Sequence, residues 1–429
     1  MKTNKTLLST AVAFGLLSSA NLANAAGFQL AEYSATGLGR AYAGEAAMAD
    51  NASAQWRNPA MLTYLEGTQV SVGAIYVNPN IDVEGEVRHP MLGNTAASSE
   101  DFAHDAIIPN FYISHRYNDQ LAIGFALGTN YGMETDLGKD FTASHFGNEA
   151  SVISKEANLN LAYQLNEQFS IGGGIRYIIA EGSFGAKAPK TNILNLPQGT
   201  TLKYMEGDDT AWGWQIGSAW QINENHRVGF TYKSEVELKL EGHAEGIAFQ
   251  NTPNFYDTGS MALTLPATAE LASFHQLSEQ LALHASINWT DWSSFKELYA
   301  DLDNNPGSMV KVENWEDNYR FAVGATYQLQ PKLALRTGIA YDTSAVSDKN
   351  RTITIPETDR TWLSVGATYD WAQNFTLDAG FTYIIAKDAP IKESRGYESD
   401  DKAQAIGGQF VGETTGNVWL IGVQANYRF

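Results

Sequence analysis

Runs of alternating apolar and polar residues dominate the chain after residue 67 and constrain its fold more than any other feature. Leu121, Ile123 and Phe125 alternate with small residues, and the stretch 319–328 has an apolar side chain at every second position. Each run is about ten residues long, the length of a tilted strand that crosses a membrane. The period alone does not decide whether the apolar face lies in a soluble core or faces lipid.

The connections between the runs decide this question, because very short polar turns alternate strictly with long loops. In outer-membrane barrels, short turns lie on the periplasmic side and long loops on the extracellular side. Six turns and seven long connections predict an all-β fold, a fourteen-stranded antiparallel transmembrane β-barrel with both ends periplasmic. The predicted turns are 118–120, 166–168, 223–225, 278–279, 330–331 and 372–374. The predicted long connections are 82–107, 132–155, 183–211, 242–259, 292–317, 343–361 and 386–416.

Residues 1–25 have the pattern of an export signal. Lys2 and Lys5 precede an apolar run over 7–17, and Ala23-Asn24-Ala25 fits a cleavage site. The apolar run is too short to cross a bilayer, which takes about 20 residues, and no later stretch qualifies as a membrane helix. A membrane-spanning form must therefore be a closed barrel, because open sheet edges are not tolerated in hydrocarbon. We predict a multi-pass protein of the outer membrane of a Gram-negative bacterium.

Composition excludes some partners and supports this location. A formal net charge of −20 argues against nucleic acid, which requires a basic surface. The chain has no cysteine, as is common in proteins exported to an oxidising compartment. Tyr and Trp residues precede several short turns, where they would form an interfacial girdle. The terminal Phe429 resembles the signal that such barrels present to the barrel-assembly machinery. Acidic residues crowd the long loops, either as a solvated face or to bind lipopolysaccharide through divalent cations.

Residues 26–67 lack strand periodicity and precede the predicted barrel, 68–429. Asn58-Pro59-Ala60 is a helix start, with Asn as the cap and Pro at the first helical position. Gly67 supplies a left-handed stop. We predict a small helical plug, or hatch, in the barrel lumen. Its charged side chains are either ordinary solvated surface or partners of a polar barrel wall: Arg40, Glu45, Asp50 and Arg57.

Two of the long loops carry apolar residues that a solvated loop does not need. Such residues mark either a binding surface or packing between the loops. Both can hold at once, since two loosely packed loops form an apolar groove. The residues of this predicted extracellular groove are Ile193, Leu194 and Leu196 in the third loop, and Ile247, Phe249, Phe255 and Tyr256 in the fourth.

By alternation, several charged residues fall on the lumen face, where they would serve as channel charges or as anchors for the plug. These residues are Arg176, Arg227, Arg320, Arg336 and Asp378. His284 and Ser286, with Asn288, raise the alternative of a hydrolytic triad in a membrane barrel. The apolar neighbours of His284 and Ser286 place that face in the lumen, away from bilayer lipid, and no G-x-S-x-G motif occurs. We predict no enzyme, no cofactor and no metal, since phosphate loops, dinucleotide motifs and metal-spaced His clusters are missing from the sequence.

The stretch AGFQLAEYSATGLGRAYAGEAAMADNASAQWRNPAM closely resembles the plug of FadL-type long-chain fatty acid transporters of the outer membrane. The resemblance extends over nearly the whole chain that follows the predicted signal. Its further motifs are Asn130-Tyr131-Gly132, TYKSEV (231–236), TDWSSF (290–295), LRTGIAYD (335–342) and NRTITIPETDRTWLS (350–364). It implies a monomeric fourteen-stranded barrel, in agreement with the independent turn count.

The resemblance also implies roles for particular residues. The ligand would first bind the extracellular groove, and then a deeper pocket beside the N-terminal segment, where Phe28 matches a pocket aromatic. Lys311 and Glu313 match charged residues near the ligand head group, although Lys311 also reads as an ordinary loop-end charge. Two motifs match the gate through which the ligand leaves sideways into the membrane. They are the plug motif Asn58, Pro59 and Ala60, and a strand kink at Asn130, Tyr131 and Gly132.

The chain departs from the family pattern near the head group. Its third loop is short, the basic residue expected at the base of that loop aligns with Ala186 or Lys187, and an expected Lys is Glu316. We therefore predict passive uptake of long-chain fatty acids or similar hydrophobic compounds. Import of aromatic hydrocarbons is the alternative within the family, and a nonspecific porin and a barrel lipase are the alternatives outside it.

Overall fold

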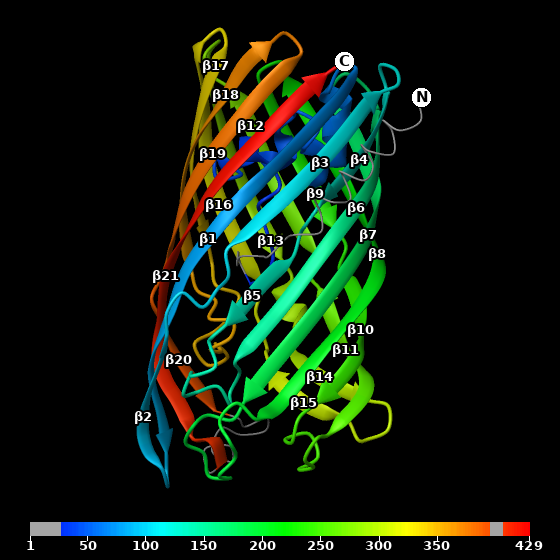
Figure 1. Cartoon of the computed structure of the whole chain (residues 1–429). Helices are drawn as coiled ribbons and strands as arrows, with labels where there is room; N and C mark the ends of the chain where they lie inside the picture. The colour runs from blue at the N-terminus through cyan, green and yellow to red at the C-terminus, as the bar shows by residue number, and fades with distance from the viewer. Residues whose placement is uncertain (1–26, 395–405) are drawn as a thin grey trace, which may run out of the picture.

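The computed structural model describes residues 27–394 and 406–429, so the predicted export signal lies outside the described residues. In this part of the chain a single antiparallel sheet closes into a fourteen-stranded barrel (Figure 1). The first and last strands close it, pairing from Gln69–Arg428 to Arg88–Gln409. The predicted fold class is confirmed.

Half of the fourteen strands run without interruption, and the other half consist of two consecutive segments. The uninterrupted strands are β1 (Thr68–His89), β6 (Glu149–Gln164), β7 (Phe169–Lys187), β8 (Thr201–Asn223), β17 (Leu333–Asp342), β18 (Arg360–Ala372) and β21 (Gln409–Arg428). The interrupted strands are β2 (Gly93–Ser99) with β3 (Ala106–Arg116), β4 (Leu121–Gly128) with β5 (Gly132–Asp136), β9 (His226–Lys233) with β10 (Val236–Glu245), β11 (Tyr256–Leu265) with β12 (Thr268–Gln276), β13 (Leu281–Thr290) with β14 (Glu297–Leu302), β15 (Ser308–Val312) with β16 (Asn318–Gln330), and β19 (Phe375–Ala386) with β20 (Ala389–Ser394).

The six short turns lie where the sequence predicts them. β3 ends at Arg116 and β4 begins at Leu121, and Asn118 Oδ1 accepts a hydrogen bond from the Leu121 N–H at 2.8 Å. Asn166 accepts the same bond from the Phe169 N–H at 2.9 Å. A short Asn side chain that mimics the backbone is the usual way to close such a turn.

The long connections are shorter than predicted, because the strands continue beyond the membrane. β7 extends to Lys187 and β8 begins at Thr201, so the predicted connection 183–211 is reduced to residues 188–200. β1 and β2 likewise form a hairpin that projects from the extracellular end of the barrel (Figure 1). Beyond the lipid both faces are solvated, so polar residues fill both and the alternation that marks a strand is lost.

The apolar face points outward, as predicted. In β7 and β8 the cross-strand partners Ile175 and Trp214 are 56% and 49% exposed, whereas Arg176, the next residue of β7, is only 2% exposed. An exposed apolar band with charges turned inward is the surface that a lipid bilayer requires. Among the described residues, no helix is both long and apolar enough to cross a membrane.

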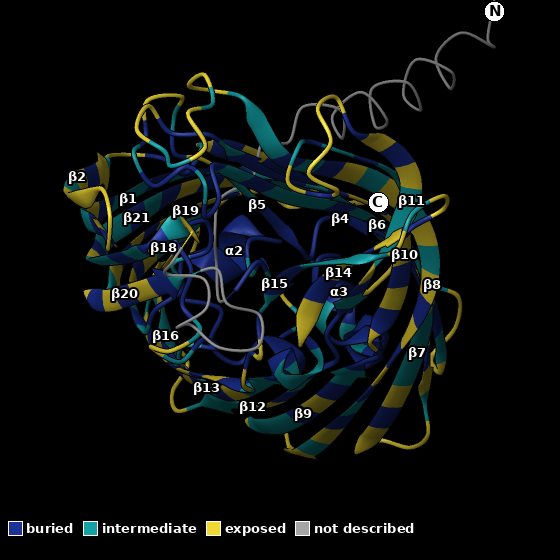
Figure 2. Ribbon diagram, turned by 90° about the horizontal axis from the view of Figure 1, so that it is seen from below, coloured by how far each residue is buried: buried dark blue, intermediate teal, exposed yellow. Residues whose placement is uncertain are grey.

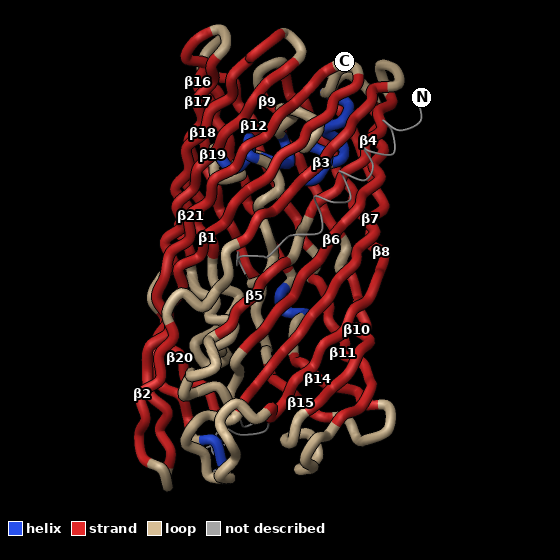
Figure 3. The backbone as a smooth tube through the Cα atoms, viewed as in Figure 1, coloured by secondary structure: helices blue, strands red, loops and turns tan. Residues whose placement is uncertain are grey.

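Four short helices lie inside the barrel, where they occupy its periplasmic half (Figures 2 and 3). Asn58 caps the last of them as predicted, accepting the Ala60 N–H at 3.0 Å, although that helix is of the 3-10 type. Gly67 then adopts the left-handed conformation, at φ +61°. The helices are α2 (Ala35–Leu38), η1 (Glu45–Ala47), α3 (Ala54–Arg57) and η2 (Pro59–Tyr64).

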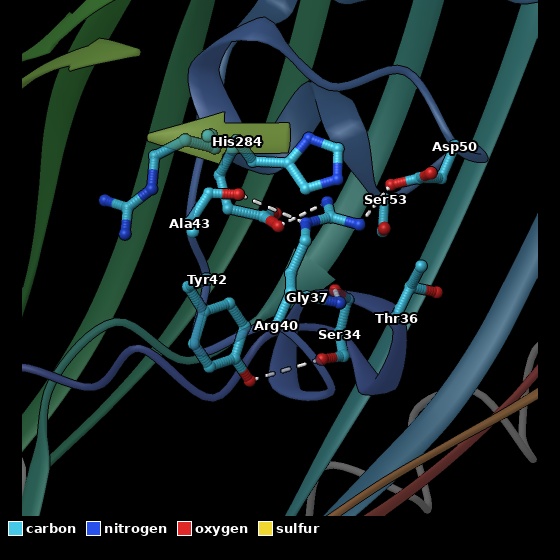
Figure 4. A network of polar contacts seen from close by, with 12 residues as sticks. Ser34, Thr36, Gly37, Arg40, Tyr42, Ala43, Asp50, Ser53 and His284 are labelled. Atoms are coloured by element: carbon cyan, nitrogen blue, oxygen red, sulfur yellow. Dashed lines mark hydrogen bonds and ion pairs between the residues drawn. The ribbon is translucent and has the colours of Figure 1, made fainter. Parts of the chain in front are cut away.

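The charged residues of this internal segment pair both with one another and with the barrel wall. Arg40 bonds Glu45 at 2.5 Å and Asp50 at 2.8 Å, and this network is shown in Figure 4. Asp50 also lies 3.9 Å from Arg336 of β17, and Arg57 lies 3.0 Å from Glu270 of β12. The wall-pairing alternative is therefore confirmed for Asp50 and Arg57.

The predicted lumen charges also face inward. Arg227 donates to the Ala47 carbonyl at 3.1 Å, and Arg320 donates to the Ala41 carbonyl at 2.9 Å. Bonds from a rigid wall to backbone carbonyls of the internal segment fix that segment in place.

Candidate functional site

The strand formed by β4 and β5 is interrupted at residues 129–131, and the N-terminal segment is hydrogen-bonded to this kink. The Leu30 N–H donates to the Asn130 carbonyl and the Gly132 N–H donates to the Phe28 carbonyl, both at 2.7 Å. Gln29 and Tyr131 thus form an isolated antiparallel bridge. β3 pairs with β4 as far as Phe111–Leu127, so beyond this level residues 28–30 take the place of a neighbouring strand. We call residues 28–30 the latch.

The kink is held from the barrel wall by polar contacts. Asn130 Nδ2 donates to Glu156 Oε2 at 2.5 Å, and Arg176 binds both oxygens of Glu156, at 2.8 and 2.9 Å. The hydroxyl group of Tyr131 donates to the Pro266 carbonyl at 2.8 Å. The kink is therefore bonded to the barrel wall through its side chains and to the latch through its backbone.

The Phe28 ring lies in a pocket of aromatic side chains. Its centroid is 4.6 Å from that of Trp292, 5.7 Å from Phe295, 5.9 Å from Trp315 and 6.1 Å from Tyr131. These edge-on and tilted arrangements are the favourable ones for aromatic pairs. We call this cluster the Phe28 pocket; it belongs to the largest apolar core of the barrel.

The pocket forms where two strands are interrupted and turn into the lumen, between β13 and β14 and between β15 and β16. Trp292 begins the short helix η3 (Trp292–Ser294) between β13 and β14, and Phe295 follows that helix directly. Trp315 lies between β15 and β16. None of these three residues was assigned to the pocket from the sequence. The signal was present, since TDWSSF breaks the alternation with two adjacent serines and places its aromatics three apart.

Lys311 and Glu313 lie beside the Phe28 pocket and are both buried. The Lys311 ammonium lies 3.0 Å from Glu393 Oε1, donates to Thr354 Oγ1 at 3.2 Å and sits 5.5 Å above the Phe184 ring. This cation therefore has a carboxylate partner within the chain. Glu393 was not predicted, because it is far away in the sequence and no local pattern connects the two.

Glu313 connects this charged pair to the aromatic rings. Its Oε2 accepts the Trp315 indole N–H at 2.9 Å, while its Oε1 has no partner among the described residues. Burial raises the pKa of Glu313 to about 7, against the opposing effect of the Lys311 charge. At neutral pH this carboxyl group is thus poised between its neutral and charged forms.

With the fold and this geometry in place, comparison with known proteins identifies the class of the chain. Residues 16–429 match the family of outer membrane transport proteins described as OMPP1/FadL/TodX. The chain belongs to this family.

Individual members of the family are similar along their full length. The long-chain fatty acid transport protein of Escherichia coli O6:H1 is 33% identical, with 100% of this chain and 99% of that protein covered. The 47 kDa outer membrane protein of Pasteurella multocida is 36% identical with the same coverage. The chain is accordingly an outer-membrane transport protein of a Gram-negative bacterium.

Solved structures support the same fold. A FadL homologue of Pseudomonas aeruginosa superposes with a TM-score of 0.82 at 22% identity, over 94% of this chain and 100% of that chain. The toluene transporter TbuX of Ralstonia pickettii superposes with a TM-score of 0.66 at 17% identity, with the same coverage.

The second gating motif predicted from the FadL resemblance lies away from the kink. Asn58 Nδ2 donates to the Ala46 carbonyl at 2.6 Å and to the Ser218 carbonyl at 3.0 Å. A Cβ atom at Gly217 would lie 1.9 Å from Asn58 Oδ1, and one at Gly172 would lie 2.5 Å from the Ala60 nitrogen. Asn58, Pro59 and Ala60 thus lie directly against β7 and β8, which approach closely because they carry glycine there.

The predicted groove residues of this FadL-type chain fall into three groups: buried, exposed and half-buried. Phe249 and Phe255 stack at 5.6 Å and are buried in the same apolar core as Phe28. Leu194 in the third loop is 62% exposed, and Tyr256 after the fourth is 61% exposed. The remaining three are half-buried: Ile193, Leu196 and Ile247. The fourth loop is bonded to the start of β8, where the Ala248 N–H donates to the Leu202 carbonyl at 2.9 Å.

The side chains of the alternative hydrolytic triad face the lumen, as the alternation predicts, and have separate partners. His284 Nε2 lies 2.9 Å from Thr326 Oγ1, and Ser286 Oγ accepts the Gly44 N–H at 3.3 Å. Asn288 donates to Glu270 at 2.8 Å. Their roles in the structure are contacts to the internal segment and the wall. Within residues 27–394 and 406–429, no group of three or more His, Asp or Glu side chains is placed to hold a metal ion.

Proposed function

We propose that this protein takes up long-chain fatty acids passively across the outer membrane, by way of the Phe28 pocket and the kink. One observation carries the proposal. The latch both forms one wall of the apolar pocket, through Phe28, and closes the kink, through its two backbone hydrogen bonds. A ligand that displaces the Phe28 ring therefore removes the partner of the kink edge in the same movement.

The driving force is the transfer of the acyl chain from water. Each buried CH₂ group contributes about 0.8 kcal/mol, so a long chain needs no coupled energy source to enter an apolar pocket. The exposed apolar face of Leu194, with the half-buried Ile193, Leu196 and Ile247 beside it, supports a first binding site on the extracellular side. Phe249 and Phe255 would connect that site to the Phe28 pocket, since all three belong to one core.

Exit sideways at Asn130, Tyr131 and Gly132 follows from the same geometry. On the periplasmic side of the pocket, the lumen is occupied by the helices of the internal segment, whose Arg57 is anchored to Glu270 of the wall. The kink is the place where the wall is completed by a short, non-covalent segment. A hydrophobic ligand released there enters the membrane without contact with water.

Aromatic hydrocarbons are the second candidate ligands, and a specific observation favours them. Lys311 is already neutralised by Glu393 at 3.0 Å, so the Phe28 pocket offers aromatic faces without an uncommitted cation above them. The solved structures of toluene transporters share this fold. Neutral hydrocarbons do not require a cationic partner.

Uptake in a strain that lacks its own transporter separates these alternatives. We expect uptake of a long-chain fatty acid by the wild type, and Lys311→Ala should weaken fatty-acid binding while leaving toluene unaffected. Wild-type uptake of toluene alone would overturn the fatty-acid assignment, and free passage of sugars would indicate a porin. Equal loss of both ligands in Lys311→Ala would remove Lys311 from the head-group site.

Three further proposals concern the surroundings of the barrel. We propose that the protein acts as a monomer with no catalytic role, that its acidic extracellular residues contact lipopolysaccharide, and that the barrel-assembly machinery inserts it. Ester cleavage by the wild type that is lost in Ser286→Ala would contradict the proposal that the protein has no catalytic role. We also propose residues 1–25, 26–67 and 68–429 as signal peptide, plug and barrel, with Asn58, Pro59 and Ala60 in the gating machinery.

A further inference from the structure

Lys233 is a buried lysine that the family roles leave unexplained. It ends β9 on the inner face of the barrel and is 5% exposed. Its Nζ atom lies 3.5 Å from Asn130 Oδ1, at the limit of a hydrogen bond, and 4.7 Å from the centroid of the Trp56 ring. Both contacts are with neutral groups. An ionisable side chain held inside a membrane protein is costly and is usually retained for a function.

The charges around Lys233 do not compensate for it. The ionisable groups that act on it are Glu156, Arg176, Arg57 and Glu270. Glu156 is committed to Arg176 through two bonds, at 2.8 and 2.9 Å, and Glu270 is committed to Arg57 at 3.0 Å. Two acids and three cations leave one positive charge in excess. An anion that entered here would therefore stabilise the ammonium form of Lys233, which burial by itself disfavours.

Lys233 also lies where a departing ligand would pass. Asn130, its hydrogen-bond partner, accepts the backbone bond of the latch from Leu30. Thr268, the cross-strand partner of Lys233, lines a cavity of about 30 Å³ together with Gln29, Leu30 and Arg57. This volume holds about two water molecules, so the cavity leaves room for a small polar group beside the kink.

We propose that Lys233 binds the carboxylate of the ligand at the kink, at the stage when the latch has left Asn130. This inference rests on the proposed function and deepens it, because it makes the gate selective for acids of long apolar chains over neutral molecules of the same length. Lys311 lies at the Phe28 pocket and is paired with Glu393, whereas Lys233 lies at the kink and has no carboxylate partner within ion-pairing distance among the described residues. Lys233 is thus placed to receive the head group after the ligand has left the pocket. Arg57, bonded to Glu270, positions the internal segment against the same cavity.

Two ligands that differ in charge alone test the proposal: palmitic acid and hexadecanol. Loss of a charge-assisted contact should weaken palmitate binding to purified Lys233→Met about tenfold or more, with hexadecanol binding unchanged. Lys233→Arg should restore palmitate binding. Lys233→Gln keeps a donor for Asn130 without the charge, and it should behave as Lys233→Met does. Uptake by cells should follow the same order.

A matched control separates the general effect on folding of removing a buried ammonium group from the specific effect on ligand binding of removing Lys233. Lys203 is also 5% exposed but lies near the extracellular end, where its Nζ donates to the Met309 carbonyl at 3.0 Å. Lys203→Met should match Lys233→Met in the heat-dependent gel mobility that reports a folded barrel. Unchanged palmitate binding in Lys233→Met, or an equal loss of palmitate and hexadecanol, would overturn the proposal while the uptake function stands. A wild-type protein that binds neither ligand would overturn the proposed function as well.

Discussion

Phe28→Ala is the change that most directly tests the coupling of pocket and kink. The Phe28 side chain is 1% exposed and contacts four aromatic rings, so its removal should cost about 3–5 kcal/mol. The two backbone hydrogen bonds of the latch contribute only about 1 kcal/mol each. The Phe28 ring therefore contributes more to holding the latch on the kink than its two backbone hydrogen bonds together; Leu30, which is also buried, adds to the ring's contribution.

The expected consequence is a shift of the latch toward its released form. Since every 1.4 kcal/mol is tenfold, a loss of about 3 kcal/mol raises the released population relative to the closed one by about a hundredfold. The chain has no cysteine, so Ala31→Cys, at a half-buried position next to the latch, introduces a single thiol whose rate of reaction with a maleimide reports this release. The rate should increase strongly when Phe28→Ala is added, and fatty-acid binding should weaken.

The barrel itself provides the control. Phe146→Ala makes the same change at a residue that is 2% exposed but belongs to a separate apolar cluster near the extracellular end. It should destabilise its own cluster and leave the reactivity of the introduced thiol unchanged. Equal maleimide rates with and without Phe28→Ala would refute the reasoning, since the ring would then not hold the latch.

Three other predictions concern the internal segment and the head-group region. Glu270→Gln leaves the half-buried Arg57 without its carboxylate partner, which should cost about 1.5–3 kcal/mol and lower the unfolding temperature of the barrel. Gly217→Ala should reduce the amount of folded barrel seen in gel mobility, because its Cβ would lie 1.9 Å from Asn58 Oδ1. Glu313 binds its proton more tightly when folded, with a pKa of about 7 against the usual 4.5. Its contribution to stability is therefore fully present below about pH 4.5 and is lost as the pH rises through 7, and Glu313→Gln should flatten the stability profile measured by thermal unfolding over that range.

The barrel could be predicted from the sequence because each strand carries its own signal. Alternation marks the segments that face lipid on one side, and Asn118 and Asn166 mark turns by local chemistry. Beyond the lipid the signal ends, so the extensions of β7 and β8 have the sequence character of loops. The thickness of the bilayer sets the length of the strand segment inside the membrane, but it does not set the length of the extension on the extracellular side.

The site was predicted only in part, for a related reason. Phe28 and Asn130 were assigned through resemblance, and the structure joins their segments by two backbone hydrogen bonds that no local pattern indicates. Trp292 and Trp315 enter the pocket because their strands turn inward, and Lys311 meets Glu393 across the barrel. Contacts of this kind are set by the closure of the sheet, so they follow from the fold as a whole.

The way in which the internal segment is attached favours its N-terminus, and not the whole segment, as the part that moves in the proposed function. Arg57 and Asp50 are tied to the wall by ion pairs with Glu270 and Arg336, and rupture of either pair leaves one of these buried wall charges without its partner. The latch, in contrast, is held by the apolar side chains of Phe28 and Leu30, by one neutral hydrogen bond from Thr290 to Gln29, and by backbone groups that an extended segment or water molecule can replace. An apolar ligand can substitute for a ring, but it cannot substitute for a salt bridge. We therefore expect ligand binding to act on residues 28–30 and to leave the helices behind them in place, so that the proposed exit opens at the kink while the barrel stays blocked along its axis.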